Sequence, residues 1–109
     1  MRKIITYGGY FEAFMKNLTI AQQQKVKYGL LLLKKQDRVS SKFVKYVGEG
    51  LFELRTEYEG NIFRTFFIYD RGAVVVLLNG FQKKTQKTPY KEIEKAQRIK
   101  EAYYEGTRK

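Results

Sequence analysis

Three strand-like segments, separated by short glycine-containing turns, constrain the fold of this chain more than any other feature of its sequence. Residues 52–58 alternate apolar and polar side chains, which is typical of a strand with one buried face. Residues 62–69 and 73–81 are rich in β-branched and aromatic side chains, and the second of these segments begins apolar on both faces. Gly60 and Gly72 supply the backbone freedom that tight turns require. The sequence therefore predicts an antiparallel meander.

The residues before this meander follow the period of a helix. Apolar residues between Phe11 and Leu18 recur three and four positions apart, which places them on one face of a short helix. Thr19, followed three positions later by Gln22, is a capping-box signature for a second helix over residues 20–36. We expect these two helices to form a hairpin whose apolar face packs into the core.

The two ends of the chain complete the predicted fold. Residues 2–7 form a short strand, and Thr88 with Pro89 begins a last helix that ends at Gly106. The resulting order is β-α-α-β-β-β-α, an α+β arrangement in a single domain over residues 1–109. We expect the helices to cover one face of the sheet and to leave the other face free for function.

Two residue types that carry much of enzyme chemistry are missing. The chain has no cysteine and no histidine, which excludes disulfide scaffolds, thiol nucleophiles and histidine-based triads. No phosphate-binding loop or dinucleotide fingerprint occurs, and the acidic residues show no metal-binding spacing, so we expect neither cofactor nor metal.

The apolar runs are far shorter than the ~20 residues of a membrane span, and the first residues lack signal-peptide features. We therefore expect a cytoplasmic protein without a membrane partner.

Positive charge is concentrated outside the predicted strands. Lys and Arg number 22 against 11 Asp and Glu, which gives a net charge of +11. The link between the second helix and the meander contains Lys42 and Lys45, and the third strand is followed by Lys83, Lys84 and Lys87. A small domain with this balance attracts nucleic acid, an anionic membrane surface or an acidic partner protein.

Two arginines of the meander stand out against its near-neutral charge. If residues 59–60 form a two-residue turn, Arg55 lies opposite Arg64 on one face of the sheet. Like charges across neighbouring strands repel each other, and an anion between them relieves the repulsion; two guanidinium groups suit a phosphate. Alternatively, Glu53 and Glu57, on the same face as Arg55, neutralise it in an ordinary surface network.

Phe81 ends the third strand and is followed by lysines. An aromatic ring beside cations is the combination that stacks a base and holds a phosphate, and Gly80 permits close approach of another segment. The alternative is a core phenylalanine followed by a solvated lysine run.

RNA cleavage by the RNA's own 2′-hydroxyl is a reaction for which arginine, lysine and tyrosine suffice. The protein must neutralise the pentavalent phosphorane and assist proton transfer. Arginines can supply the charge. A lysine crowded by other cations has a lowered pKa and can serve as general base.

Several segments of the C-terminal half resemble the RelE/HigB toxins, and more narrowly their phage-derived Gp49-like branch. The similarity lies in Glu-Leu-Arg at residues 53–55, Phe-Arg-Thr at 63–65, and the run over 75–89, which ends in Lys-Lys-Thr-Gln-Lys-Thr-Pro. It continues into Glu-Ile-x-x-Ala at residues 92–96. The resemblance implies the RelE/ParE superfamily fold, in agreement with the α+β prediction.

The resemblance also implies a function. Proteins of this kind are toxins of type II toxin–antitoxin systems. They act as ribosome-dependent endoribonucleases, or mRNA interferases, that cut mRNA in the decoding site by 2′-hydroxyl attack and so inhibit translation. A helix-turn-helix, HigA-like antitoxin holds them inactive. The expected partners are therefore mRNA on the ribosome and such an antitoxin.

The positions that match the family pattern imply the site residues. The catalytic residues would be Arg55, Arg64, Lys83 and Lys84. The two arginines would neutralise the phosphate and the transition state, and one of the two lysines would transfer the proton. Phe81 would stack on a base or pack as a wall. The RNA backbone would be contacted by Lys87. Lys42 and Lys45 lie outside the matching positions, and the charge of the basic link adds them as RNA contacts.

Two other functions stay open. The superfamily also contains ParE-like toxins, which inhibit a protein target such as DNA gyrase and cut no RNA. A basic RNA-binding or ribosome-binding module without catalysis also fits the charge.

Overall fold

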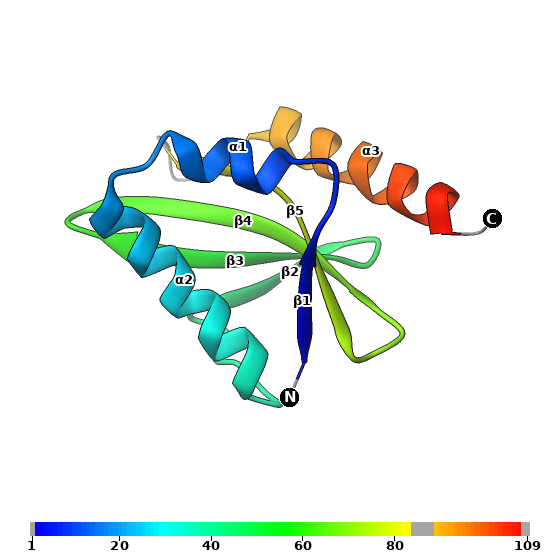
Figure 1. The fold of residues 1–109 in the computed structure, drawn as a ribbon, viewed down its shortest axis with the longest axis horizontal. Coiled ribbons are helices and arrows are strands. Elements are labelled where there is room, and N and C mark those ends of the chain that lie inside the picture. The colour runs from blue at the N-terminus through cyan, green and yellow to red at the C-terminus, as the bar shows by residue number, and fades with distance from the viewer. Residues whose placement is uncertain (1, 84–88, 108–109) are drawn as a thin grey trace.

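A five-stranded sheet and three helices make up the described residues, 2–83 and 89–107, of the computed structural model (Figure 1). In chain order the elements are β1 (Lys3–Thr6), α1 (Tyr10–Lys16), α2 (Ile20–Lys35), β2 (Val44–Gly48), β3 (Leu51–Tyr58), β4 (Asn61–Asp70), β5 (Val74–Lys83) and α3 (Tyr90–Thr107). This order confirms the predicted α+β arrangement, with one strand, β2, added within the basic link. Within the described ranges, no helix combines the length and apolar character that crossing a membrane requires.

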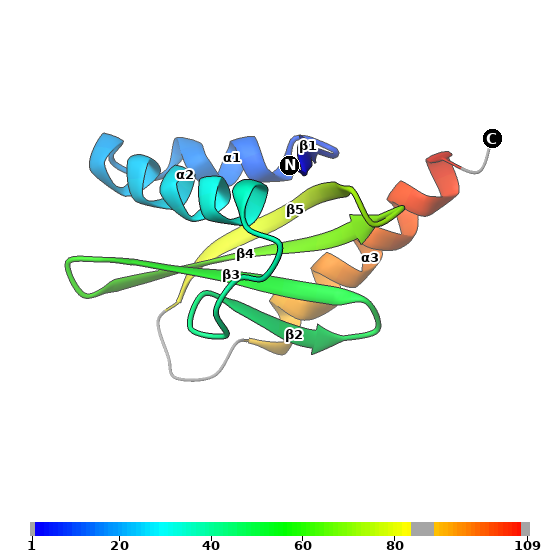
Figure 2. The same cartoon turned by 90° about the horizontal axis from the view of Figure 1, so that it is seen from below.

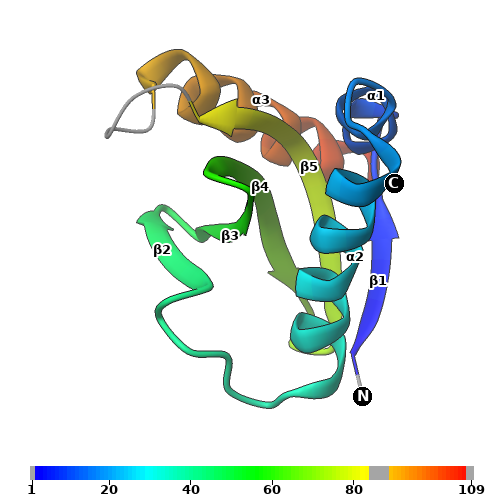
Figure 3. The same cartoon turned by 90° about the vertical axis from the view of Figure 1, so that its left-hand side faces the viewer.

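The strands are arranged in the order β1-β5-β4-β3-β2. β3, β4 and β5 form the predicted antiparallel meander, β2 runs antiparallel to β3, and β1 pairs in parallel with β5. Figure 3 shows the strong twist of this sheet, with β1 and β2 at its two edges. β2 was not predicted because its five residues, Val-Lys-Tyr-Val-Gly, are too few and too exposed to show a clear alternation.

The turn between β3 and β4 fixes the register of the meander. Glu59 and Gly60 have φ angles of 48° and 81°, and such positive values are typical of a two-residue hairpin turn. Tyr58 therefore pairs with Asn61. The predicted two-residue turn is confirmed, and with it the pairing of every residue along the two strands.

The start of α2 is fixed by the predicted capping box. The Thr19 hydroxyl accepts a hydrogen bond from the Gln22 backbone N–H at 3.1 Å, and the Gln22 side chain accepts one from the Thr19 N–H at 2.9 Å. Two N–H groups that the first turn of a helix leaves without partners are thereby satisfied. The capping box sets where the chain turns from α1 into α2.

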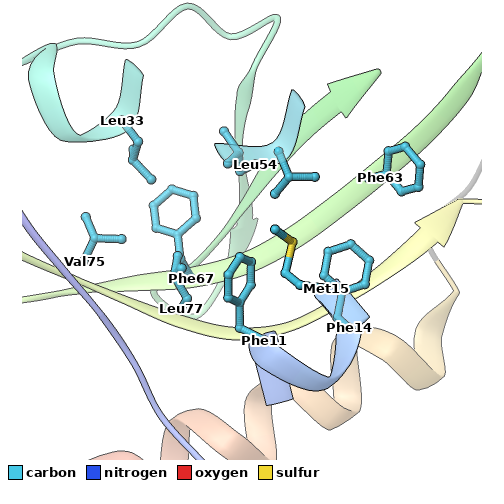
Figure 4. Packing of buried hydrophobic residues seen from close by; sticks show 10 residues of the cluster. Phe11, Phe14, Met15, Leu33, Leu54, Phe63, Phe67, Val75 and Leu77 are labelled. Carbon is cyan, nitrogen blue, oxygen red and sulfur yellow. The ribbon is translucent and has the colours of Figure 1, made fainter. Parts of the chain in front are cut away.

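α1 and α2 pack together on one face of the sheet. Figure 4 shows Phe11, Phe14 and Met15 of α1 in a buried cluster with Phe67 of β4. Gly80 of β5 allows the close approach of α1, because a Cβ at this position would lie 2.5 Å from the Phe14 ring. The helical hairpin therefore contributes core, as its apolar spacing predicts.

α3 packs on the opposite face of the sheet (Figure 2). Its residues Ala96, Ile99 and Tyr103 share a buried cluster with Phe66 of β4 and Leu78 of β5. The expectation that the helices cover a single face is therefore wrong. β4 and β5 are apolar on both sides along much of their length, so both faces of these strands must be covered.

Candidate functional site

α3 covers only part of the second face. The sheet residues that it contacts extend toward the β4–β5 turn, whereas Arg55 and Arg64 lie on the same face but nearer the β3–β4 turn. Figure 2 shows this end of the β3–β4 hairpin extending past α3. The part of this face near the β3–β4 turn is therefore not covered by α3.

We call this section the basic face and define it by five residues: Lys45 of β2, Arg55 of β3, Arg64 of β4, and Phe81 and Lys83 of β5. Arg55 is paired with Arg64, and Arg64 with Phe81, so the three side chains share a face. Lys83 lies two residues beyond Phe81 on the same strand. Lys45 is paired with Glu53, which lies two residues before Arg55. Side chains two positions apart on a strand point to the same face.

The pairing of Arg55 with Arg64 confirms the predicted register, but each arginine also has a carboxylate partner. Arg55 Nη2 lies 2.9 Å from Glu57 Oε2, and Arg64 Nη1 contacts Glu53 Oε1. These pairs are the neutralising network that the sequence offered as the alternative. The repulsion between the two guanidinium groups is therefore already reduced, and an anion is not required to explain their placement.

The two ion pairs differ in exposure. The Arg64 and Glu53 side chains are 11% and 2% exposed, whereas those of Arg55 and Glu57 are 30% and 51% exposed. Within the described part of the chain, the buried Nε of Arg64 has no hydrogen-bond partner. Arg64 is therefore held in the sheet, whereas Arg55 is the arginine that is accessible to a ligand.

Lys83 lies in an unusual electrostatic environment. Burial and the positive charges of Arg64, Arg55 and Lys45 lower the pKa of Lys83 below its usual value of 10.5, although Glu53 acts in the opposite direction. A lowered pKa makes the neutral amine more available at physiological pH. A larger fraction of Lys83 than of an unperturbed lysine is therefore neutral and able to act as a base.

Phe81 is half-buried beside this cluster. Its ring is stacked with that of Phe66, with 5.7 Å between the ring centroids and an interplanar angle of 25°. Phe81 also packs against the cluster that α3 completes. The ring therefore packs beside the basic face, and its contact with RNA stays a prediction.

The remaining predicted residues lie elsewhere. Lys42 is in the turn before β2, where its Nζ is 6.0 Å from the centre of the Phe43 ring, and it lines a pocket beside Arg55. Lys84 and Lys87 lie outside the described residues. Tyr28 of α2 also lines this pocket and was not predicted. No sequence pattern indicates it, because α2 and β3 are brought together only by the fold.

The basic face can bind an anion and exchange a proton. Its cations come from four different strands, and two of them, Arg55 and Arg64, differ in burial. Over residues 2–83 and 89–107, no group of three or more carboxylates could hold a metal ion. The chemistry open to these side chains is charge neutralisation by guanidinium groups combined with proton transfer by a lysine.

The chain matches the model of a known protein family. The match, to "Phage derived protein Gp49-like (DUF891)", covers residues 13–101. It runs from α1 into α3 and includes the whole basic face. A search of the curated proteins found no match.

Proposed function

Since the chain belongs to the family of Gp49-like phage-derived proteins, a toxin-like family of toxin–antitoxin systems, we propose that it is a ribosome-dependent mRNA endoribonuclease. Membership of this family implies a cognate antitoxin. To this family membership the proposal adds a reaction, its RNA substrate and the residues that act on the RNA. The observation that carries it is the basic face, where two opposed arginines adjoin a lysine of lowered pKa.

The proposed reaction starts with the 2′-hydroxyl of the RNA. A base removes its proton, and the oxygen attacks the adjacent phosphorus. The bond from phosphorus to the 5′-oxygen then breaks, and the 5′-oxygen takes up a proton. The products are a 2′,3′-cyclic phosphate and a free 5′-hydroxyl, so the RNA supplies both the nucleophile and the leaving group.

The basic face supplies what the RNA lacks. Arg55, the more exposed arginine, binds the non-bridging oxygens and stabilises the charge that grows in the transition state. Arg64 adds positive charge from a fixed position. Lys83 accepts the proton of the 2′-hydroxyl, for which its lowered pKa suits it. Phe81 forms the wall against which a base can lie.

Further cations extend the proposed RNA path. Lys45 lies on the basic face at edge strand β2, and Lys42 lines the same pocket as Arg55, so both add positive charge near the edge of the sheet. Lys84 and Lys87, outside the described residues, are proposed from the sequence alone as a second proton-transfer candidate and an RNA contact. The net charge of +11 also favours rapid encounter with an acidic segment of a helix-turn-helix antitoxin.

Translation with purified ribosomes and a defined mRNA tests the proposal. Primer extension should reveal cleavage at ribosome-occupied codons with the wild-type protein. Arg55→Ala should reduce the cleavage rate by roughly 10²–10³-fold, because it removes one donor to the transition state. Lys27→Ala, which removes an exposed lysine of α2 outside the basic face, is the matched control and should cleave normally.

Two results would reject the proposal. Arrested growth or translation with intact mRNA would indicate a protein target, such as gyrase for ParE-like toxins. Ribosome or RNA binding that weakens steeply with salt, without any cleavage product, would indicate a non-catalytic binding module.

A further inference from the structure

A pocket of about 420 Å³ opens between α2 and the outer edge of β3, next to the basic face. Among the residues that line it are Lys25 and Tyr28 of α2, Lys42 of the turn before β2, and Arg55, Thr56 and Glu57 of β3. Its volume lies in the range of small-ligand sites. Arg55 belongs to both the pocket and the basic face, so the two adjoin at this residue. We call it the α2–β3 pocket.

The β3 wall of this pocket carries polar backbone groups. β2 pairs with β3 only as far as Leu54, and beyond it the Arg55 N–H donates to the Phe43 carbonyl at 2.7 Å. Backbone groups alternate in direction along a strand, so the N–H and C=O of Glu57 also point to this outer edge. No strand among the described residues pairs with them there. A neighbouring donor and acceptor suit the edge of a nucleobase.

Thr56 adds a buried polar group to the same wall. Thr56 is 5% exposed, and its hydroxyl has no hydrogen-bond partner among the described residues. A buried hydroxyl without a partner is unfavourable, and a ligand that offers one relieves this cost. Gly29 brings α2 close to it, since a Cβ at that position would lie 2.7 Å from Thr56 Cγ2. The inner end of the pocket is therefore narrow and firmly packed.

Tyr28 and the surrounding charges give the pocket the character of a nucleotide site. Tyr28 is 53% exposed, and Lys25 Nζ lies 5.5 Å from the centre of its ring. Exposed aromatic rings beside cations stack on unpaired bases. Lys42 and Arg55 can neutralise a phosphate. The carboxylate of Glu59, which also lines the pocket, can accept a hydrogen bond from an exocyclic amino group.

We propose that the α2–β3 pocket binds one unstacked base of the RNA whose backbone crosses the basic face, and that it favours bases with an exocyclic amino group over uracil. The proposal rests on the proposed function and assigns a specificity element to the same site. Tyr28 stacks on the base, the Glu57 backbone and the Glu59 carboxylate read its edge, and Arg55 holds the adjoining phosphate.

Titration of the ¹⁵N-labelled protein with AMP, CMP, GMP and UMP, followed by the backbone amide signals, tests the pocket without any cleavage. The amides of Gly29 and Glu57 should shift, and UMP should bind most weakly. Tyr28→Ala should weaken binding by at least about fivefold, as expected for the loss of one stacking contact. Leu31→Ala removes another exposed apolar side chain of α2, outside the pocket lining, and should bind as the wild type does.

Thr56→Val provides a second variant that keeps the fold, because it replaces a hydroxyl by a methyl group of similar size. It should unfold at the same or a higher urea concentration and yet bind the monophosphates more weakly. The proposal is overturned if no nucleotide shifts the amides of Gly29 and Glu57, or if Leu31→Ala lowers affinity as much as Tyr28→Ala. It is also overturned if Tyr28→Ala changes only the affinity for an antitoxin, which would assign the pocket to a protein interface.

Cleavage assays separate this proposal from the proposed function. If the protein cuts mRNA, Tyr28→Ala should still cut but with a changed distribution of cut codons and a higher KM, whereas Leu31→Ala should match the wild type. An unchanged distribution and KM would contradict a role in specificity. If the wild type cuts nothing, the proposed function fails, and the nucleotide titration still decides whether the pocket binds a base.

Discussion

Replacement of Arg64 by alanine should cost the protein a large part of its stability. The Arg64 and Glu53 side chains are 11% and 2% exposed, so the substitution would leave a buried carboxylate without its arginine. Removing one partner of a buried ion pair costs about 3–5 kcal/mol. The free energy of unfolding of a domain is roughly 5–15 kcal/mol. Arg64→Ala therefore removes a fifth or more of the stability of a typical domain.

Urea unfolding followed by far-UV circular dichroism measures this loss, since the chain has no tryptophan to report by fluorescence. With an m-value of about 1.5 kcal/mol/M, the midpoint should fall by roughly 2–3 M. Arg55→Ala is the matched control, because the Arg55–Glu57 pair is 30% and 51% exposed. An exposed pair contributes about 0–1 kcal/mol, so this variant should unfold close to the wild type.

The double variant Glu53→Met/Arg64→Met completes the test. Replacing both charges by apolar side chains of similar size removes the buried carboxylate that Arg64→Ala leaves without its arginine, and should recover most of the stability. The reasoning is refuted if Arg64→Ala costs no more than Arg55→Ala, or if the double variant is at least as unstable as Arg64→Ala. The outcome also decides which arginine can be used for activity measurements, because a variant that unfolds reports nothing about catalysis.

Two further predictions concern pH. Tyr103 donates a hydrogen bond to Asp70 Oδ2 at 2.6 Å, and this bond raises the pKa of Tyr103 to about 12. The raised value means that the bond stabilises the fold fully below pH 10, and that this contribution is lost as the pH rises from 10 to 12. Tyr103→Phe should lower the free energy of unfolding at pH 8 by about 1 kcal/mol. Urea titrations should also show that this free energy declines less steeply above pH 10 in the variant than in the wild type. An equally steep decline in both proteins would contradict the assignment. For Lys83, whose pKa is lowered, the cleavage rate should rise with pH until the amine is neutral. Lys83→Ala should abolish that rise, and a profile unchanged by the substitution would exclude Lys83 as the base.

Local chemistry explains why the meander and its register could be predicted. Gly60 and a two-residue turn are sufficient to place Arg55 opposite Arg64, because a hairpin has few geometries. The capping box at Thr19 is likewise a short-range signal. Both depend on residues close together in the sequence, and both are confirmed.

Long-range packing explains what could not be predicted. The apolar residues on both faces of β5 indicate that both faces are covered, but no local pattern shows that α3 crosses to the side opposite α1 and α2. The buried pairing of Glu53 with Arg64 also depends on how deeply the fold encloses the two side chains. The pocket between Tyr28 and Thr56 exists only because α2 packs on β3.

A single 2′-deoxynucleotide in the mRNA tests the central claim most directly. The substrate carries the deoxy sugar at the nucleotide whose 2′-hydroxyl would attack, and cleavage is measured on purified ribosomes with the wild-type protein. We predict that cleavage at that site is abolished, and that the all-ribose mRNA yields a 2′,3′-cyclic phosphate and a 5′-hydroxyl. Cleavage of the deoxy substrate at the same rate, or no cleavage of either mRNA while translation stops, would contradict the account.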